Sequence, residues 1–328
     1  MELPPPPARF WALATGHFLS RCLHVAAEIG VADCLDNSPK ALDALARECG
    51  CNANALGRIL RLLATVDVFE NGADGWLHTD LSRLLRSDHP SSMRAFARML
   101  GGRLQWAGLG ELLHTVRTGE TAIERVVPGG IWAYLGDHPD DARVFDDAMV
   151  SKANAMIDAL LPAFDFSPYS VIADIGGGRG HILRAIMDAT PRASGILFDL
   201  PNVLASVAPS TRIELRSGDF FKDRLPQADA YVISEVLHDW PDEQALAIVR
   251  AVRSAAREGA HVLVLEAILP DEPGPHAAKM LDVIMLALTG GRERTRGEHE
   301  ALMRAGGFQL ERVVSIANPV SILVGVAS

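Results

Sequence analysis

A histidine beside several acids is the part of this 328-residue chain best suited to chemistry. His238 is followed directly by Asp239 and Trp240, after an apolar, strand-like run. Histidine is the side chain best suited to proton transfer near neutral pH. Two further acids, Glu266 and Glu293, also follow apolar elements, and a carboxylate beside an imidazole fixes its tautomer and stabilises its charged form. These residue types indicate a proton-transfer site; the alternative is a histidine in an ordinary surface loop.

A glycine-rich turn lies upstream of this histidine. Residues 171–180 read Val-Ile-Ala-Asp-Ile-Gly-Gly-Gly-Arg-Gly, and an apolar helical pattern follows. The segment predicts a strand, a tight turn and a helix, in which glycines let backbone N–H groups approach a ligand. The dinucleotide spacing G-x-G-x-x-G fails, because its last glycine would fall on His181. The spacing that fits is acid-x-G-x-G-x-G, formed by Asp174, Gly176, Gly178 and Gly180. A glycine-rich turn of an unrelated α/β protein is the alternative.

Two more acids follow the next predicted strands. Asp199 comes about twenty residues after the glycines, where a nucleotide site places an acid that accepts hydrogen bonds from ribose hydroxyls. Asp219 precedes Phe220, and the pair could bind an adenine, the carboxylate accepting from its amino group and the ring packing on it. Both acids also fit simple turns, because Asp-Leu-Pro-Asn and Gly-Asp are turn signals.

Apolar strand-like runs and helical patterns alternate from residue 170 onward. The predicted strands cover 171–175, 195–199, 212–216, 230–234 and 262–266, and a helix is predicted over 242–257. This alternation predicts a parallel, doubly wound α/β sheet, which binds ligands at the carboxyl ends of its strands. Two last strands, over 308–315 and 320–327 with a turn around Asn318-Pro319, predict a C-terminal antiparallel hairpin.

The N-terminal part reads as helices followed by a small hairpin. The prolines at 4–7 predict a stiff, extended lead-in that is not helical. Residues 8–35 form a helical pattern more apolar than one exposed helix needs, which favours a dimer contact over core packing. Helices over 38–50 and 52–66, then two short strands over 68–78 around Asn71-Gly72, give a winged-helix-like pattern.

A winged helix raises the alternative of a DNA-binding regulator. The second predicted helix offers only Arg58 and Arg61 among leucines, and a recognition helix needs several exposed basic residues. The net charge of −10 also argues against a nucleic-acid partner or an anionic membrane. We therefore expect a packing and oligomerisation module that binds neither nucleic acid nor membrane.

The composition is that of an ordinary soluble protein, with 48% hydrophobic and 22% charged residues. No apolar run is long enough to span a bilayer, and the first residues lack the basic and apolar regions of a signal peptide. The four cysteines have no zinc-finger spacing, so we expect reduced thiols, a cytoplasmic location and no metal.

Residues 88–165 are predicted to be mostly helical, with breaks at 101–102, 127–130 and 138–139. Large apolar side chains gather here, and they either pack in a core or wall an aromatic substrate pocket. They are Trp106, Trp132, Tyr134, Phe145 and Met149.

Six motifs in order, at family spacing, give the chain a close resemblance to a known family. They are Ala-Asp-Ile-Gly-Gly-Gly-Arg-Gly, Phe-Asp-Leu-Pro, Ser-Gly-Asp-Phe-Phe, Leu-His-Asp-Trp-Pro-Asp-Glu, Leu-Glu-Ala-Ile-Leu-Pro and Gly-Gly-Arg-Glu-Arg-Thr. The chain resembles the small-molecule O-methyltransferases that use S-adenosylmethionine, of the plant caffeate and bacterial polyketide and phenazine type. The resemblance implies a class I methyltransferase sheet with a C-terminal antiparallel hairpin and a winged-helix-like N-terminal domain. We divide the chain into a dimerisation domain (1–100), a helical linker and pocket region (101–165) and a catalytic domain (166–328).

The resemblance also assigns roles to single residues. His238 would be the general base, oriented by Glu266 and Glu293, for methylation of a hydroxyl, most readily a phenolic one, on an aromatic secondary metabolite. Cofactor binding would fall to Asp174, Gly176, Gly178, Asp199, Leu200, Gly218, Asp219, Phe220, Ser234 and Trp240. The acceptor would be bordered by Trp132, Phe145, Met149, Asp239, Met285 and Thr289. The implied partners are S-adenosylmethionine, the aromatic acceptor and a second copy of the chain bound through the N-terminal helices.

Two segments depart from the plant pattern. Ser234 stands where plant members often carry a lysine that contacts the cofactor, and residues 287–290 replace an asparagine-bearing acceptor segment. These changes leave cofactor use in place and put a plant-like acceptor in doubt. The alternatives are N- or C-methylation or a non-methylating hydroxylase or decarboxylase activity on the same fold, and, more remotely, a nicotinamide dehydrogenase.

Overall fold

The computed structural model describes residues 4–316 and 319–328. The chain divides into two compact units, Met1–Trp106 with Asp140–Ser151, and Ala107–Pro139 with Lys152–Ser328. The long helix α9 (Pro139–Ala163) contributes residues to both units. The division predicted at residues 100 and 165 stays a prediction.

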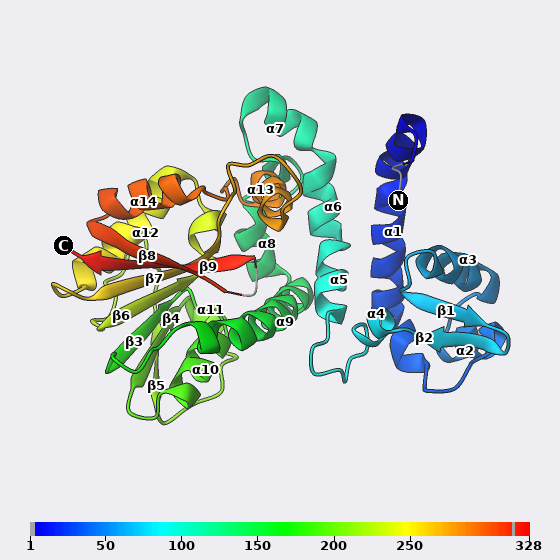
Figure 1. Ribbon diagram of the computed structural model, residues 1–328, viewed down its shortest axis with the longest axis horizontal. Helices are drawn as coiled ribbons and strands as arrows, with labels where there is room; N and C mark the ends of the chain where they lie inside the picture. Colours follow the sequence, from blue (N-terminus) through cyan, green and yellow to red (C-terminus); the bar gives the residue numbers. More distant parts are fainter. Residues whose placement is uncertain (1–3, 317–318) are drawn as a thin grey trace. The chain divides into compact units, whose positions relative to one another are not determined.

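The N-terminal unit is built of helices around one apolar core, with a two-stranded hairpin (Figure 1). Its first helices are α1 (Pro6–Ile29), η1 (Val31–Cys34), α2 (Leu42–Glu48) and α3 (Ala53–Ala64). The hairpin β1 (Phe69–Gly72) and β2 (Gly75–His78) is followed by α4 (Asp80–Arg83), α5 (Arg94–Leu100) and α6 (Arg103–Gly110), whose last residues belong to the second unit. The core includes Leu45, Leu60, Phe69 and Trp76. The four cysteines are free thiols.

Three details of this unit differ from the prediction. The helix α1 begins at Pro6, inside the proline run, because proline lacks only an N–H that the first helical turn leaves unpaired anyway. The helix α2 begins at Leu42, because Lys40 instead pairs with Trp76 of β2. The hairpin turns at residues 73–74, since Gly72 pairs with Gly75 and the Asn71-Gly72 pair lies within β1.

The second unit is a sheet of seven strands covered by helices on both faces. Its strands are β3 (Val171–Ile175), β4 (Ser194–Asp199), β5 (Ile213–Ser217), β6 (Ala230–Ser234), β7 (His261–Ala267), β8 (Phe308–Ser315) and β9 (Val320–Ala327). Their order is β5-β4-β3-β6-β7-β9-β8, parallel up to β7 and antiparallel for β9 and β8. The predicted class I methyltransferase sheet is confirmed; the predicted turn around Asn318-Pro319 lies partly outside the described residues.

Alternate residues of the central strands face two separate cores (Figure 1). On β6, Tyr231 and Ile233 face α12 (Asp242–Ala255) and α14 (Arg296–Ala305). The neighbouring residues Ala230 and Val232 face α9 and α10 (His181–Ala189). This period of two, buried on both faces, is what a central parallel strand requires.

The remaining elements of this unit are mostly short helices. They are α7 (Leu112–Thr118), η2 (Ala122–Arg125), α8 (Gly130–Asp137), α11 (Pro201–Leu204), η3 (Leu237–Asp239) and α13 (Ala277–Leu288). The predicted breaks at 101–102, 127–130 and 138–139 fall at the α5–α6, η2–α8 and α8–α9 junctions, whereas the breaks on either side of α7 were not predicted. Over the described residues, no helix combines the length and apolarity that a membrane crossing requires.

Candidate active site

His238 lies in the short helix η3, just beyond the carboxyl end of β6. Its imidazole is buried, and its backbone N–H donates to Oε1 of Glu266 at 3.1 Å. Nδ1 lies 2.9 Å from Oε1 of Glu293, which makes Nδ1 the protonated nitrogen and leaves Nε2 to accept a proton. Nε2 is 3.7 Å from Oδ1 of Asp239. The structure therefore brings together all three residues predicted to form the catalytic group.

The loop that carries His238 is held in place by the segment that carries Glu293. Arg294 is almost fully buried and donates to the carbonyl oxygens of Leu237 and Trp240, each at 2.9 Å. The N–H of Arg292 donates to the His238 carbonyl at 2.9 Å. A Cβ on Gly291 would lie 2.0 Å from that same carbonyl oxygen, so only glycine fits there. Gly291, Arg292 and Arg294 thus hold in place the loop that carries His238.

The charges around His238 strongly favour its protonated form. Burial lowers the pKa of His238, but Asp239, Glu293 and Glu266 together raise it more, from 6.5 to about 10. Burial raises the pKa of Asp239 to about 6 and that of Glu266 to about 7, although His238 opposes both shifts. Protons are therefore shared within this buried group near neutral pH.

The same group has the geometry of a possible metal site. One ligand atom from each of His238, Glu266 and Glu293 lies within 4.8 Å of the others, and Oε2 of both glutamates is buried without a hydrogen-bond partner among the described residues. The expectation that the protein uses no metal stays a prediction.

The glycine-rich turn lies between β3 and α10 and surrounds a buried acid. Asp174 is 1% exposed, and neither of its carboxylate oxygens has a hydrogen-bond partner among the described residues. Burial, followed by the charge of Asp199, raises its pKa from 3.8 to about 7. A Cβ on Gly177 would meet this carboxyl at 2.4 Å, and Gly176 and Gly178 have φ of 70° and 58°. The turn therefore needs glycine both for space and for backbone conformation.

Asp199 lies at the carboxyl end of β4, beside the glycine-rich turn. Oδ2 of Asp199 accepts from Gly178 N–H at 2.8 Å, and Oδ1 accepts from Leu200 N–H at 2.7 Å. Gly218, whose added Cβ would clash with the Phe198 ring at 2.6 Å, donates its N–H to the Asp199 carbonyl. The acid thus joins the glycine turn to the ends of β4 and β5.

An aromatic cluster closes this edge of the sheet. Phe220 and Phe221 have ring centroids 4.8 Å apart, and Trp240 lies 4.8 Å from Phe221 and 6.1 Å from Phe220. The Asp219 carboxylate accepts from Phe221 N–H and forms an ion pair with Lys222, which lowers its pKa. The predicted adenine-binding residues are therefore neighbours, and Asp219 also stabilises its own turn.

These features fit the cofactor that the sequence implies. An unpartnered buried carboxylate at Asp174 suits a positively charged group, the glycines leave backbone exposed, and the aromatic cluster suits a flat base. Ser234, at the end of β6, has its hydroxyl 3.6 Å from the Met156 sulfur and carries no charge to replace the lysine of plant members.

The predicted acceptor-binding residues fall into two groups. Met285, Thr289, Trp132 and Asp239 belong to the second unit. Thr289 donates to the Met285 carbonyl at 3.1 Å and accepts from Gly291 N–H, so it supports the segment behind His238, and Trp132 is 40% exposed. Phe145 and Met149 lie on the part of α9 that belongs to the N-terminal unit, and their role stays a prediction.

Several residues of the site were missed from the sequence. Lys152 forms an ion pair with Glu235 at 2.5 Å, and Glu235 has a φ of 51°, which is rare outside glycine. His299 is fully buried, and neither ring nitrogen has a hydrogen-bond partner among the described residues. The long-range pairing of Lys152 left no local signal, whereas Arg294 lay inside one of the quoted motifs.

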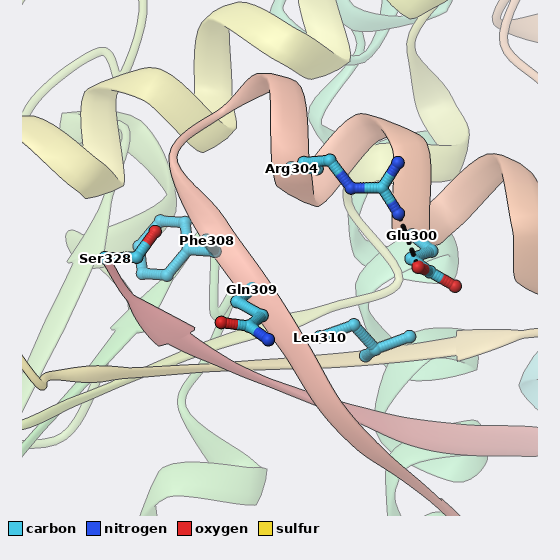
Figure 2. Close-up of a pocket in the computed structure, with 6 residues that line it drawn as sticks. All are labelled: Glu300, Arg304, Phe308, Gln309, Leu310 and Ser328. Carbon is cyan, nitrogen blue, oxygen red and sulfur yellow. Dashed lines mark hydrogen bonds and ion pairs between the residues drawn. The ribbon is translucent and has the colours of Figure 1, made fainter.

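A surface hollow also lies at the far edge of the sheet (Figure 2). It is lined by Phe308, Gln309 and Leu310 of the edge strand β8, with Glu300, Arg304 and Ser328 beside them. Arg304 and Glu300, both on α14, form an ion pair with each other at one side of it. It contains none of the predicted site residues, so the candidate active site remains at the end of β6.

Comparison with known proteins identifies the family of the chain. Residues 106–309 match the O-methyltransferase domain and residues 11–88 the O-methyltransferase dimerisation domain. The chain is 38% identical to the phenazine O-methyltransferase PhzM of Lysobacter antibioticus, over 95% of this chain and 93% of that protein. It is 35% identical to an 8-amino-8-demethylriboflavin N,N-dimethyltransferase of Streptomyces davaonensis, over 88% and 86% of the two chains.

A solved structure shows the same fold. The O-methyltransferase NcsB1 from neocarzinostatin biosynthesis, in complex with S-adenosylmethionine and 2-hydroxy-5-methyl naphthoic acid, has a TM-score of 0.81 and 31% identity, covering 95% of this chain and 96% of that one. The family match covers more than half of the chain, and the relatives align over nearly all of it. The chain therefore belongs to the O-methyltransferase family and is an S-adenosylmethionine-dependent methyltransferase.

Proposed function

We propose that this methyltransferase acts on a phenolic hydroxyl of an aromatic secondary metabolite, with His238 as general base. The observation that carries the proposal is the 2.9 Å contact between Nδ1 of His238 and Glu293 in a buried site. A carboxylate on Nδ1 fixes the tautomer whose Nε2 can accept a proton. S-adenosylmethionine supplies, when bound, a methyl group on a positively charged sulfonium.

The proton transfer fits a phenol. His238 Nε2 accepts the hydroxyl proton, and Glu293 and Asp239 stabilise the imidazolium that results. The same acids that raise the pKa of His238 stabilise the imidazolium that forms when Nε2 accepts this proton. S-adenosylmethionine would supply the methyl group that this oxygen receives, so the products would be a methyl ether and S-adenosylhomocysteine.

The cofactor would be held by the strand ends around the glycine turn. Asp174, Gly176 and Gly178 are suited to its amino-acid end, and Asp199 to its ribose. The adenine would be bound by Gly218, Asp219, Phe220 and Trp240. Leu200 and Ser234 would lie at the edge of the cofactor site. The unpartnered oxygens of Asp174 and the aromatic cluster support this assignment.

Relatives support the class of acceptor. Their names include phenazine, mitomycin and 3-amino-4-hydroxybenzoate O-methyltransferases, and NcsB1 is bound to a hydroxynaphthoic acid. Each name describes that protein alone, but the shared feature is an aromatic acceptor. The apolar residues Met285 and Trp132 of the second unit would border such a ring.

A homodimer through the N-terminal helices is part of this proposal. The matched dimerisation domain includes most of α1, whose side chains Phe10, Trp11, Leu13 and Phe18 are exposed within the single chain. Apolar surface of this extent on one helix is suited to contact with a second copy.

Titration with S-adenosylhomocysteine and a methylation assay test the proposal together. We expect micromolar binding of S-adenosylhomocysteine, none of NADH, and methyl transfer to phenols but not to the matched anilines. Transfer to anilines with equal or higher kcat/KM would support the second candidate, N-methylation, which the riboflavin-type relative favours. Consumption of an acceptor with no methylated product would indicate a non-methylating activity instead.

A further inference from the structure

A lysine–glutamate pair lies beside the proposed base and has no part in the mechanism above. The ammonium of Lys152, on α9, lies 2.5 Å from Oε1 of Glu235, and the two side chains are 26% and 14% exposed. Glu235 is the first residue after β6, and its N–H donates to the Leu265 carbonyl at 2.9 Å. Burial lowers the pKa of Lys152, but Glu235 outweighs this and raises it, so the side chain is a cation. All of these residues belong to the second unit.

Charged and titratable groups from five elements surround His238 and its neighbours Asp239 and Glu293, and most of these groups are acidic. The loop after β6 contributes Glu235 and Asp239, β7 contributes Glu266, the segment after α13 contributes Glu293 and Arg294, α14 contributes His299, and α9 contributes Lys152. Four carboxyl groups therefore accompany two cations and a histidine whose pKa burial lowers to about 4.

The two cations differ in the acids that lie around them. Arg294 already donates to two carbonyl oxygens and to the Asp242 carboxylate at 2.8 Å. Lys152 has Glu235 as its ion-pair partner and lies within electrostatic range of Asp239 and Glu293. A general base must release its proton between turnovers, and uncompensated carboxylates around it oppose that release.

We propose that Lys152 is a positioning residue whose charge, paired with Glu235, offsets the acids around His238 and favours the neutral imidazole that accepts the substrate proton. This inference rests on the proposed role of His238. It assigns the pair an electrostatic task in the reaction beyond fastening α9 to the loop after β6.

Two single variants test the proposal because they change the charge in opposite directions. In Lys152→Met a cation is lost, so the acid limb of the kcat–pH profile moves to higher pH, by on the order of one pKa unit. In Glu235→Gln an anion is lost, so the limb moves to lower pH. Lys152→Arg keeps the charge and the wild-type limb. Lys279→Met is the matched control, because that lysine of α13 donates to the backbone carbonyls of Glu272 and Gly274, in the segment before the helix.

A Lys152–Glu235 pair with only a structural role would give a different result. If the pair served only to hold the loop, both variants would lose activity with the limb unmoved, or would move it in the same direction; either result overturns the proposal. If Lys152→Met does not fold, the downward shift in Glu235→Gln remains a complete test. Binding of S-adenosylhomocysteine, which the pair does not contact in this account, stays within twofold of the wild type in each folded variant.

A second readout separates this proposal from the proposed function. The ring resonances of His238, identified by comparison with His238→Gln, are titrated by NMR in the wild type and both variants without any acceptor. The same opposite shifts are expected there even if no phenol is methylated. A wild-type enzyme with no turnover on phenols would refute the proposed function alone, whereas unchanged His238 titration in both variants would refute the role of Lys152.

Discussion

At the scale of single residues, the site keeps polar groups buried at a cost to stability. His299 is fully buried, and this burial lowers its pKa from 6.5 to about 4. The native state thus binds the proton less tightly than the unfolded state, so the stability present above pH 6.5 is lost as the pH falls toward 4. The total loss is on the order of 3 kcal/mol.

His299→Phe should remove this dependence. We expect the variant to match or exceed the wild type in free energy of unfolding at pH 7 and to exceed it by about 2 kcal/mol near pH 5. Urea denaturation across this range measures the difference. If the free energies of unfolding of the two proteins changed in parallel with pH, the low pKa assigned to His299 would be contradicted.

The stability contributed by Asp174 has the opposite dependence on pH. Its pKa is raised from 3.8 to about 7, so the native state holds a proton that is lost as the pH rises toward and beyond 7, and with it stability on the order of 4 kcal/mol. Asp174→Asn should therefore raise Tm at pH 8, and leave it nearly unchanged at pH 4, while weakening S-adenosylhomocysteine binding at least tenfold. A variant less stable than the wild type at pH 8 would show that this carboxylate has a partner in the folded protein.

At the scale of elements, the segment 290–295 is the support on which the base depends. A Cβ on Gly291 would overlap the His238 carbonyl, which is backbone and cannot move aside. Gly291→Ala should therefore displace η3 and reduce kcat by a factor of about 10² or more, the loss expected when a base is misplaced by about 1 Å. Gly297→Ala is the matched control, because its Cβ meets nothing within 4 Å, and it should leave kcat unchanged. Equal activity in the two variants would contradict this supporting role.

The helices and strands were the most predictable part of this protein. The strands β3, β6, β8 and β9 have the predicted bounds, because their apolar runs end sharply at acids, glycines or polar residues. Errors fell where a local signal was overridden: Pro6 fits the first turn of a helix, and Lys40 is recruited to a strand by Trp76. The site was predictable only where chemistry lay in motifs. Lys152 was missed because its partner Glu235 is distant in the sequence, and His299 because nothing local shows that a histidine is buried.

At the scale of the whole molecule, the central question is assembly. The face of α1 carries Phe10 and Leu13 with 75% and 82% of their surfaces exposed. If this face binds a second copy, Phe10→Glu with Leu13→Glu should convert a dimer into a monomer with unchanged helix content. Sedimentation velocity measures this, with a pair of changes on the exposed face of α14, Glu300→Gln and Arg304→Gln, as the control. A dimer that survives the α1 changes would place the contact elsewhere.

The acceptor is the feature that the sequence leaves least determined. Its pocket residues come from separate segments of the chain, so their spacing in the sequence carries no information about the shape of the pocket. The net charge of −10 is spread over the whole chain and does not identify a ligand. The chemistry at His238 is therefore better defined than the molecule on which it acts.

Single-turnover methyl transfer by His238→Gln tests the central claim most directly. Both enzymes are saturated with S-adenosylmethionine and with a phenol that the wild type methylates, and S-adenosylhomocysteine binding is measured beside them. The account predicts a rate lower by about 10²–10⁴-fold, with cofactor affinity within a few-fold of the wild type. An unchanged rate would contradict it and show that positioning of the acceptor alone, without a base, is enough for methyl transfer.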